Sequence, residues 1–258
     1  MEVLPIRTPV LKTGDDFASM LAASGMLRDG DVLVVSSKAV ATCEGAAIDL
    51  SKITPTAEAV EWSKKCGQTP EFRQAVLDET KRMHGWVGGS CPHAMFTYLK
   101  PDGFTTGALL SANAGLDLSN VIKGFAIGWP LDPVASTKIL AAKVAERSGK
   151  KVAVIIGDSC CMPARLGVIA FALTACGIDP LVNHMGTSDL FGKTFRMTRE
   201  AVADQLCIAA NYVMGNTGQQ TPAAVVRGHG LQASEFCGWV EGIEPEEDLF
   251  RDILWKSR

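Results

Sequence analysis

The sequence lacks several features that define common functional classes. Its longest apolar stretch, VIAFALTACGI, has eleven residues, far fewer than the roughly 20 that span a bilayer. The opening MEVLPIRTPV has an early acidic residue and no long apolar core, unlike a signal peptide. Basic residues form no run and the net charge is −3, so the chain has no electrostatic footprint for nucleic acid. We therefore expect a cytoplasmic protein that binds neither membranes nor nucleic acids.

Cysteine spacings typical of metal or redox sites are also missing. The eight cysteines include no C-x-x-C and no Cys/His group with zinc-finger spacing. Without a secretion signal, we expect them to be reduced thiols that mostly pack as small apolar side chains. The adjacent Cys160 and Cys161 stand apart, but a disulfide between neighbours is strained. Their spacing therefore favours buried thiols over a redox switch.

The stretch GTSDLFGKT at residues 186–194 comes close to a phosphate-binding P-loop. Five residues, not four, separate Gly186 from Gly192. A P-loop follows a buried strand and opens directly into a helix. Here the preceding DPLVNHM is a poor strand, and we expect the next helix to begin at Thr198, past the lysine. The sequence predicts a turn with a solvated lysine and no Walker P-loop.

The overall composition is that of an ordinary globular protein. Of 258 residues, 47% are hydrophobic and 21% charged, enough for one large domain or two modest ones. In the first half the patterns predict a strand in VLPI, a helix after residues 13–16, a strand in VLVVSSKAV, helices near 55–66 and 70–83, a loop in GWVGGSCPHAMF, and a short strand with a turn in GALLSANAGLDLSN.

The second half predicts a similar mixture. We expect a helix from Asp132-Pro133 to Gly149 that buries Ala135, Ile139 and Ala142, a strand in KVAVII, a buried helix in ARLGVIAFALTACG, a helix from Thr198 to Gly215, a strand in AAVVRG, and a C-terminal helix in EPEEDLFRDILWKSR that docks through Leu249, Phe250, Ile253 and Leu254. Strands and helices alternate irregularly, which predicts an α+β or mixed α/β fold.

Two aspartates have neighbours that suit a metal site. Asp158 follows the apolar KVAVIIG, at the edge where sheet proteins place ligands, and Ser159 adds a hydroxyl. Asp117 lies in SANAGLDLSN between Asn113 and Asn120. Carboxylates and a hydroxyl are ligands that a hard divalent cation prefers. Each aspartate could equally be a cap or a turn former.

Eight fragments occur in the order and at the separations of a known family. They are LPIR, GDVLVVSSK, SANAGLDLSN, VIIGDS, DLFGK, AVADQL…VMG, AVVRG and PEEDLFR. Together they resemble the coenzyme F420-0:L-glutamate ligases over nearly the whole chain. The resemblance implies the F420 glutamate ligase-like fold, an intertwined α+β homodimer without a Walker P-loop. Residues 1–258 would form a single unit of this fold, or two intertwined lobes.

The resemblance also implies a reaction. Such enzymes use GTP and Mg²⁺ or Mn²⁺, and we add K⁺ to the expected ions. They join the amine of L-glutamate to a carboxylate of the deazaflavin coenzyme F420-0, or here of a related acid, through an acyl phosphate. GDP and phosphate are released. The expected partners are these small molecules and a second copy of the chain.

Residue by residue, the resemblance implies the following roles. Asp117 and Asp158 match ligands of a first metal ion, and Ser159 matches a ligand of a second. Arg165 joins the two aspartates as an expected catalytic residue. The positions that match nucleotide contacts are Leu4, Pro5, Ile6, Arg7, Ser37, Lys38, Asn120, Gly215 and Asn216.

The chain departs from the family pattern at several positions. After GDS the family usually shows Gly-Arg-Pro-Trp-Arg, where residues 161–165 read CMPAR. Thr42 stands where a basic residue is usual, and Asn216 or Gln219 where an acidic residue is expected. Two alternatives therefore stay open: a non-catalytic family member that binds a deazaflavin-like or other small anion, and a thiol protein that uses Cys160 and Cys161.

Overall fold

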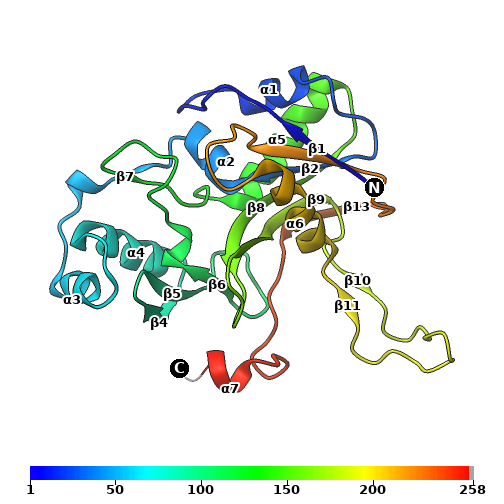
Figure 1. Cartoon of the computed structure of the whole chain (residues 1–258). Helices are drawn as coiled ribbons and strands as arrows, with labels where there is room; N and C mark the ends of the chain where they lie inside the picture. The colour runs from blue at the N-terminus through cyan, green and yellow to red at the C-terminus, as the bar shows by residue number, and fades with distance from the viewer. Residues whose placement is uncertain (256–258) are drawn as a thin grey trace. The chain divides into compact units, whose positions relative to one another are not determined.

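The computed structural model describes residues 1–255, and the chain divides into two compact units (Figure 1). Unit 1 comprises Met1–Val40 and Asp132–Val240. Unit 2 comprises Ala41–Leu131 and the segment that begins at Glu241. The prediction of a mixed α+β fold is confirmed. Within the described residues, no helix is long and apolar enough to cross a membrane.

Unit 1 is built on a six-stranded sheet with the strand order β1-β12-β2-β8-β9-β13. Its strands are β1 (Glu2–Ile6), β2 (Val32–Ser36), β8 (Ala153–Cys161), β9 (Val168–Ile178), β12 (Ala223–Arg227) and β13 (Ala233–Trp239). β2 and β8 are parallel, and the other neighbouring pairs are antiparallel. The central strands are continuous apolar runs because both faces of the sheet are covered. The strands predicted in VLPI, KVAVII and AAVVRG are confirmed, whereas the strand predicted in VLVVSSKAV ends at Ser36, and the residues from Ser37 on form a helix.

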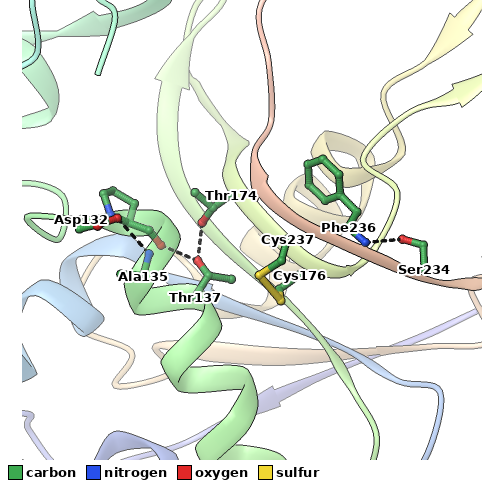
Figure 2. The surroundings of a disulfide bond; sticks show 9 residues. Asp132, Ala135, Thr137, Thr174, Cys176, Ser234, Phe236 and Cys237 are labelled. Atoms are coloured by element: carbon green, nitrogen blue, oxygen red, sulfur yellow. Dashed lines mark hydrogen bonds between the residues drawn. A yellow bond between two sulfur atoms is a disulfide. The ribbon is translucent and has the colours of Figure 1, made fainter. Parts of the chain in front are cut away.

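Helices cover the two faces of this sheet. α6 (Val202–Met214) packs through Ala203 and Leu206 against one face, which includes Ile155 of β8. α5 (Pro133–Ser148) packs on the other face, where Thr137 Oγ1 lies 2.5 Å from Thr174 Oγ1 (Figure 2). Thr174 pairs with Ile156, the neighbour of Ile155, so the two helices lie on opposite faces. The short α1 (Phe17–Ala23) packs against α5, and α2 (Ser37–Cys43) follows β2.

The boundaries of α5 agree with the sequence, but its buried face does not. Asp132 caps the helix by accepting a hydrogen bond from the Ala135 amide, and Gly149 ends it with a left-handed φ of 66°. The buried side chains are those of Pro133, Ser136, Thr137, Leu140 and Val144. The predicted face was wrong, and Ile139 is 53% exposed. A hydrogen bond between hydroxyl groups fixes this helix on the sheet, and hydrophobicity alone does not reveal it.

The buried helix predicted in ARLGVIAFALTACG is wrong, because this segment forms strand β9. Its apolar run suits either structure, and pairing with β8 on one side and β13 on the other decides for the strand. Cys176 of β9 lies directly opposite Cys237 of β13, and the two form a disulfide (Figure 2). The expectation of reduced thiols is therefore wrong for these two cysteines.

A two-stranded arm leaves unit 1 between β9 and α6. It contains β10 (Val182–Asn183) and β11 (Arg199–Glu200) and extends away from the six-stranded sheet (Figure 1). GTSDLFGKT forms its end, where the Asp189 carboxylate accepts hydrogen bonds from the Phe191 and Lys193 amides. The predicted turn with an exposed lysine is confirmed. The helix start predicted at Thr198 is wrong, because Arg199 and Glu200 first pair with β10.

Unit 2 combines helices with two small sheets. Its elements are β3 (Ile48–Asp49), η1 (Leu50–Lys52), α3 (Ala57–Cys66), α4 (Pro70–Arg82), β4 (Trp86–Cys91), β5 (Ala94–Leu99), β6 (Leu109–Ala112), η2 (Asn113–Gly115), β7 (Phe125–Ala126) and α7 (Arg251–Leu254). β4, β5 and β6 form one sheet, and β3 pairs with β7. The two helices expected near 55–66 and 70–83 are confirmed.

The loop predicted in GWVGGSCPHAMF is wrong, because this segment forms the β4–β5 hairpin. Trp86 stacks on Tyr98 with ring centroids 4.8 Å apart. A Cβ on Gly88 would lie 2.4 Å from the Tyr98 ring. The glycines that argue for a loop in the sequence instead make room for aromatic rings that pack across the strands.

The C-terminal helix is shorter than predicted. α7 spans Arg251–Leu254, while Leu249 and Ile253 are 90% and 74% exposed. The predicted docking through these two residues is therefore wrong. Trp255 makes the contact instead, with its ring centroid 5.0 Å from that of Tyr98. The last part of the predicted helix, residues 256–258, lies outside the described residues.

Candidate functional site at one edge of the unit 1 sheet

Three strands of unit 1 run in the same direction and reach the same edge of the sheet. β1 and β2 are both antiparallel to β12, and β8 is parallel to β2. At this edge β2 ends with Ser36 opposite Gly157 of β8, and β1 ends with Ile6 opposite Ala223 of β12. The residues that follow these positions therefore come together, although they lie far apart in the sequence.

The residues gathered at this edge include most of those that the sequence singled out. Arg7 follows β1, Ser37 and Lys38 follow β2, and Asp158 and Ser159 follow the part of β8 that pairs with β2. Loops beyond the carboxyl ends of parallel strands are where open sheets bind ligands. We name this set of residues the sheet-edge site.

The segment between α6 and β12 also reaches the sheet-edge site. The Ser36 amide donates a hydrogen bond to Pro222 O at 2.9 Å, and the Thr8 amide donates to Gln220 O at 3.1 Å. Gly215 and Asn216 open this segment, which the resemblance expects to close over the nucleotide. Backbone hydrogen bonds therefore fasten the segment to the ends of β1 and β2.

The sequence predicts that Asp158 directly follows a strand, but in the structure it lies within β8. β8 continues to Cys161, and Asp158 pairs with Phe171 of β9. The parallel pairing with β2, however, ends at Gly157. Asp158 is thus the first residue of β8 beyond that parallel pair, and its side chain is partly exposed.

A β-bulge in β9 lies directly beside Asp158. Ile156 pairs with Thr174 and Gly157 with Ala172, so Leu173 is an extra residue in β9. The Ala172 amide at this bulge donates a hydrogen bond of 2.8 Å to the Asp204 carboxylate on α6. Asp204 therefore supports the backbone beside Asp158.

α6 also presses closely on β8 at this point. A Cβ on Gly157 would lie 2.1 Å from Cys207 Sγ. The Cys207 thiol donates a hydrogen bond to Phe171 O at 3.3 Å. Position 157 thus accepts only glycine without a rearrangement, and this close packing sets the distance between α6 and the strand that carries Asp158.

The buried groups around this bulge have shifted pKa values. Burial, and to a lesser extent the Asp204 carboxylate, raise the pKa of the Cys160 thiol to about 11. Burial first, and then Asp204 and Asp158, raise the pKa of Cys207. Burial also raises the pKa of Asp204. Because only a thiolate is a strong nucleophile, the raised pKa of Cys160 counts against the thiol-protein alternative.

Ser37 has an unusual environment. It is fully buried, and within the described residues its hydroxyl oxygen has no hydrogen-bond partner. A buried hydroxyl without a partner costs about 1–3 kcal/mol. A hydroxyl of this kind is typical of a residue that gains its hydrogen-bond partner from a bound ligand. Ser37 is one of the predicted nucleotide contacts.

The second predicted carboxylate belongs to unit 2. Oδ1 of Asp117 accepts hydrogen bonds from the Leu118 and Ser119 amides, and Oδ2 accepts one from Ser119 Oγ at 2.6 Å. The Asp117 amide and carbonyl exchange hydrogen bonds of 2.8 and 2.9 Å with Ile127. The backbone and the carboxylate of this residue are therefore both held in place.

The sequence suggested that Asn113 belongs to the polar cluster around Asp117, but the structure gives it other partners. Its side-chain oxygen accepts hydrogen bonds from Arg73 and from the Met95 amide. Asn120, the predicted nucleotide contact in this turn, is exposed and has a left-handed φ of 54°.

The structure brings together the predicted site residues of unit 1 but does not test whether Asp117 and Asp158 share an ion, which stays a prediction. Among residues 1–255, no group of three or more His, Cys, Asp or Glu side chains is arranged to hold a metal. The oxygen donors present fit Mg²⁺ or Mn²⁺ nevertheless, because these ions take one or two carboxylates and complete their shell with water and phosphate oxygens. Arg165 lies exposed in the β8–β9 hairpin.

Sequence reasoning missed Asp204, which supports the backbone beside Asp158, and Arg73, which donates a hydrogen bond to Asn113 in the turn before Asp117. Asp204 lies in the first turn of α6, and Arg73 is a fully buried residue of α4. A charged residue at a buried position of an amphipathic helix is the signal that could have identified them.

Sequence comparisons place the chain in a family. The profile of the family described as F420-0:Gamma-glutamyl ligase matches residues 5–228. The chain belongs to this family, as its sequence motifs predicted. It is similar to the coenzyme F420:L-glutamate ligase of Methanocaldococcus jannaschii, with 35% identity over 254 residues, 98% of this chain and 97% of that protein. The protein of the same name from Archaeoglobus fulgidus is 35% identical over 257 residues, 98% of each chain.

Proposed function

We propose that this chain is a ligase that uses GTP and a divalent metal ion to join L-glutamate, through a γ-glutamyl amide bond, to coenzyme F420-0 or a related carboxylic acid. The family and the relatives' names support glutamate and F420 as substrates. The observation that supports the proposal is the sheet-edge site, whose residues Arg7, Lys38, Asp158 and Ser159 lie at one edge of the sheet although their strands come from distant parts of the chain.

The proposed reaction has two steps. A carboxylate is a poor electrophile, so the acceptor first takes the γ-phosphoryl group of GTP to become an acyl phosphate, and GDP is formed. The amine of glutamate then attacks the acyl carbon, phosphate leaves, and the amine nitrogen gives up a proton. Because the phosphoryl group carries several negative charges, alignment and charge neutralisation account for most of the catalysis.

The residues of the sheet-edge site suit these tasks. Arg7 and Lys38 would hold phosphate or carboxylate oxygens by charge-assisted hydrogen bonds. Asp158, Ser159 and Asp117 would hold Mg²⁺ or Mn²⁺, and Arg165 would face the reacting groups. The bound cation would neutralise phosphate charge. The Ser37 hydroxyl and the segment from Gly215 would contact the nucleotide, together with residues 4–7 and Asn120. K⁺ belongs to the proposed set of ions.

A second candidate is a family member that binds a deazaflavin-like or other small anion without catalysis. The hairpin at residues 161–165 favours it, since Met162 and Ala164 are apolar and exposed where the family pattern has an arginine and a tryptophan. Without that arginine, binding of an anionic acceptor would be weaker. The two candidates differ in whether the bound acceptor is turned over.

We also propose that the protein works as a homodimer. The arm formed by β10, β11 and their connection exposes Leu190, Phe191 and Met197 by 99%, 95% and 86%. Apolar side chains gathered at the end of an extended arm are typical of contact with another chain. Replacing Leu190 and Phe191 by serine should convert the dimer to a monomer, as measured by sedimentation.

One assay tests the proposed activity. The protein is incubated with GTP, Mn²⁺, L-glutamate and F420-0, and phosphate release and the mass of the acceptor are followed. Acceptor-dependent phosphate with a glutamyl mass gain supports ligation, whereas acceptor binding without turnover supports the second candidate. Asp158→Asn should lower turnover by about 100-fold or more while the protein stays folded.

The matched control is Asp179→Asn. Asp179 is an exposed aspartate just past the opposite end of β9, so this substitution removes the same charge away from the sheet-edge site. Full activity in Asp158→Asn, or an equal loss in both variants, would refute the role of Asp158.

A further inference from the structure

Arg73 of α4 is a buried cation in unit 2 with an unusual set of partners. It is 0% exposed. Nε donates a hydrogen bond to Gly67 O at 2.9 Å, and Nη2 donates to Cys66 O at 2.7 Å and to His93 O at 3.3 Å. Nη1 donates to the side-chain oxygen of Asn113 at 2.7 Å. The guanidinium thus links the end of α3 to Asn113, which lies 40 positions after Arg73 in the sequence.

No carboxylate pairs with this cation among residues 1–255. Burial of the guanidinium lowers the pKa of Arg73. Replacing a buried charge by a well-packed apolar side chain is often neutral or stabilising. Stability alone therefore does not explain why position 73 is an arginine. The positions of its uncharged hydrogen-bond partners explain it better.

The partner Asn113 begins a turn with strained backbone. Asn113, Ala114 and Gly115 have φ values of 52°, 53° and 77°. A left-handed residue other than glycine costs about 1–3 kcal/mol, and it persists only where its surroundings hold it. The side-chain oxygen of Asn113 accepts from Arg73 and, at 2.9 Å, from the Met95 amide, while the Ala114 amide donates to Thr97 Oγ1 at 3.1 Å.

This left-handed turn directly precedes Asp117. Gly115 lies against Trp129, since a Cβ there would be 2.6 Å from the indole ring. Leu116 follows, 4% exposed, and Asp117 then exchanges its two hydrogen bonds with Ile127. The direction in which the chain leaves the turn therefore determines where the Asp117 carboxylate lies.

We propose that Arg73 is a positioning residue for Asp117: through the side chain of Asn113 it holds the left-handed turn at Asn113–Gly115 that aims the Asp117 carboxylate. The inference rests on the proposed function, in which Asp117 is a metal ligand. Arg73 touches neither substrate nor metal, and its effect passes through the backbone of the turn.

The test uses Asn113 variants of the full chain. Asn113→Ala removes the acceptor for Arg73. Asn113→Asp keeps an oxygen at the same place and tolerates the left-handed conformation. Two quantities are measured: hydrogen exchange of the Asp117 and Ile127 amides, which needs no metal, and Mn²⁺ affinity by electron paramagnetic resonance. The Ile155 amide in β8 reports on unit 1 as an internal control.

We expect Asn113→Ala to speed exchange at Asp117 and Ile127 and to weaken Mn²⁺ binding by about tenfold or more, as for residues that orient metal ligands. Exchange at Ile155 should not change. Asn113→Asp should restore both quantities, and Arg73→Met should behave like Asn113→Ala.

Two results would overturn the inference. One is unchanged exchange at Asp117 and Ile127 in Asn113→Ala. The other is unchanged Mn²⁺ affinity in that variant while Asp117→Asn weakens it. If Asp117→Asn has no effect on Mn²⁺ binding, the proposed metal role of Asp117 fails, and the exchange measurement still decides whether Arg73 and Asn113 hold the turn.

Discussion

Asp158 and Asp117 have the same predicted role, but unit 1 and unit 2 hold them in different ways. Asp158 lies on a strand, and the register of β2, β8 and β9 fixes its place. Asp117 lies in a turn, fixed by a two-bond bridge to Ile127 and by a left-handed entry that Arg73 supports through Asn113.

This difference affects how each carboxylate can be disturbed. Strand register is shared among many backbone hydrogen bonds, so a change at one side chain moves Asp158 only if it alters the sheet or the helix packed on it. The turn depends on a few side-chain contacts, and loss of one leaves strained residues without support. We therefore expect the Asp158 carboxylate to be displaced by substitutions that change packing, and the Asp117 carboxylate to be displaced by substitutions that remove a single hydrogen bond.

The largest expected effect on the strand side comes from the disulfide. Cys176 and Cys237 are 61 residues apart in the sequence and tie β9 to β13. Replacing both by serine should lower the free energy of unfolding of unit 1 by about 2–4 kcal/mol, because the unfolded chain gains conformational freedom. Hydrogen exchange in increasing urea measures the free energy of unfolding of unit 1. Exchange of the Asp117 amide in unit 2 should stay the same. Cys91→Ser, at an exposed free cysteine, is the control.

A smaller effect is expected from Gly157→Ala. The new Cβ would overlap Cys207 Sγ, and overpacking of this kind costs about 1–3 kcal/mol. Removing the sulfur in the double variant Gly157→Ala/Cys207→Ala should recover part of the loss, as measured by urea titration. Gly218→Ala is the control, because a Cβ there meets no atom within 4 Å. Equal costs at Gly157 and Gly218 would contradict the packing argument.

The pH dependence of stability should identify Asp204. Burial raises its pKa above the ordinary value in the folded protein. A raised carboxylate pKa contributes stability that is complete below the pKa of the unfolded chain and is lost as the pH rises through the folded-state pKa. Asp204→Asn should therefore gain stability relative to the wild type as the pH rises from below 3.8 through the folded-state pKa of Asp204. Thermal unfolding of both proteins across this range measures the difference, and Asp179→Asn, at an exposed aspartate, should show no such gain.

The smallest expected effect is at Ala164, in the β8–β9 hairpin beside the sheet-edge site. Its φ of 56° is left-handed, and the residue is exposed. Ala164→Gly should stabilise the protein by about 0.5–1 kcal/mol, because relief of the left-handed strain, about 1–2 kcal/mol, outweighs the entropic cost of glycine, about 0.5–1 kcal/mol. The same substitution at Ala142, exposed on α5, should destabilise it by about as much. Calorimetry should show opposite signs, and equal signs would argue against strain at Ala164.

The sequence predicted those parts of the fold that depend on local signals. The ends of α5 follow from Asp132, Pro133 and Gly149, which act through neighbouring backbone groups. The apolar strands β2 and β8 and the residues just beyond them were also readable. The family followed from short motifs spread along the chain.

Other parts depend on contacts that no short segment contains. VIAFALTACGI is a strand because β8 and β13 lie on either side of it. GWVGGSC is a strand because aromatic rings cover its glycines. The support of Asp158 by Asp204, and of Asp117 by Arg73, joins residues that are distant in sequence, so neither pattern nor spacing could predict it.

The strand order of unit 1 also has a consequence for how the protein is made. β12, synthesised near the end of the chain, lies between β1 and β2, which leave the ribosome first. β2 can pair with β8 once that strand emerges, but β1, whose neighbour in the six-stranded sheet is β12, must wait for it, while the hairpins of unit 2 can form as they emerge. Because pairing between distant segments is slow, β1 remains unpaired for most of translation, and the edge of the sheet that carries Arg7 is completed late.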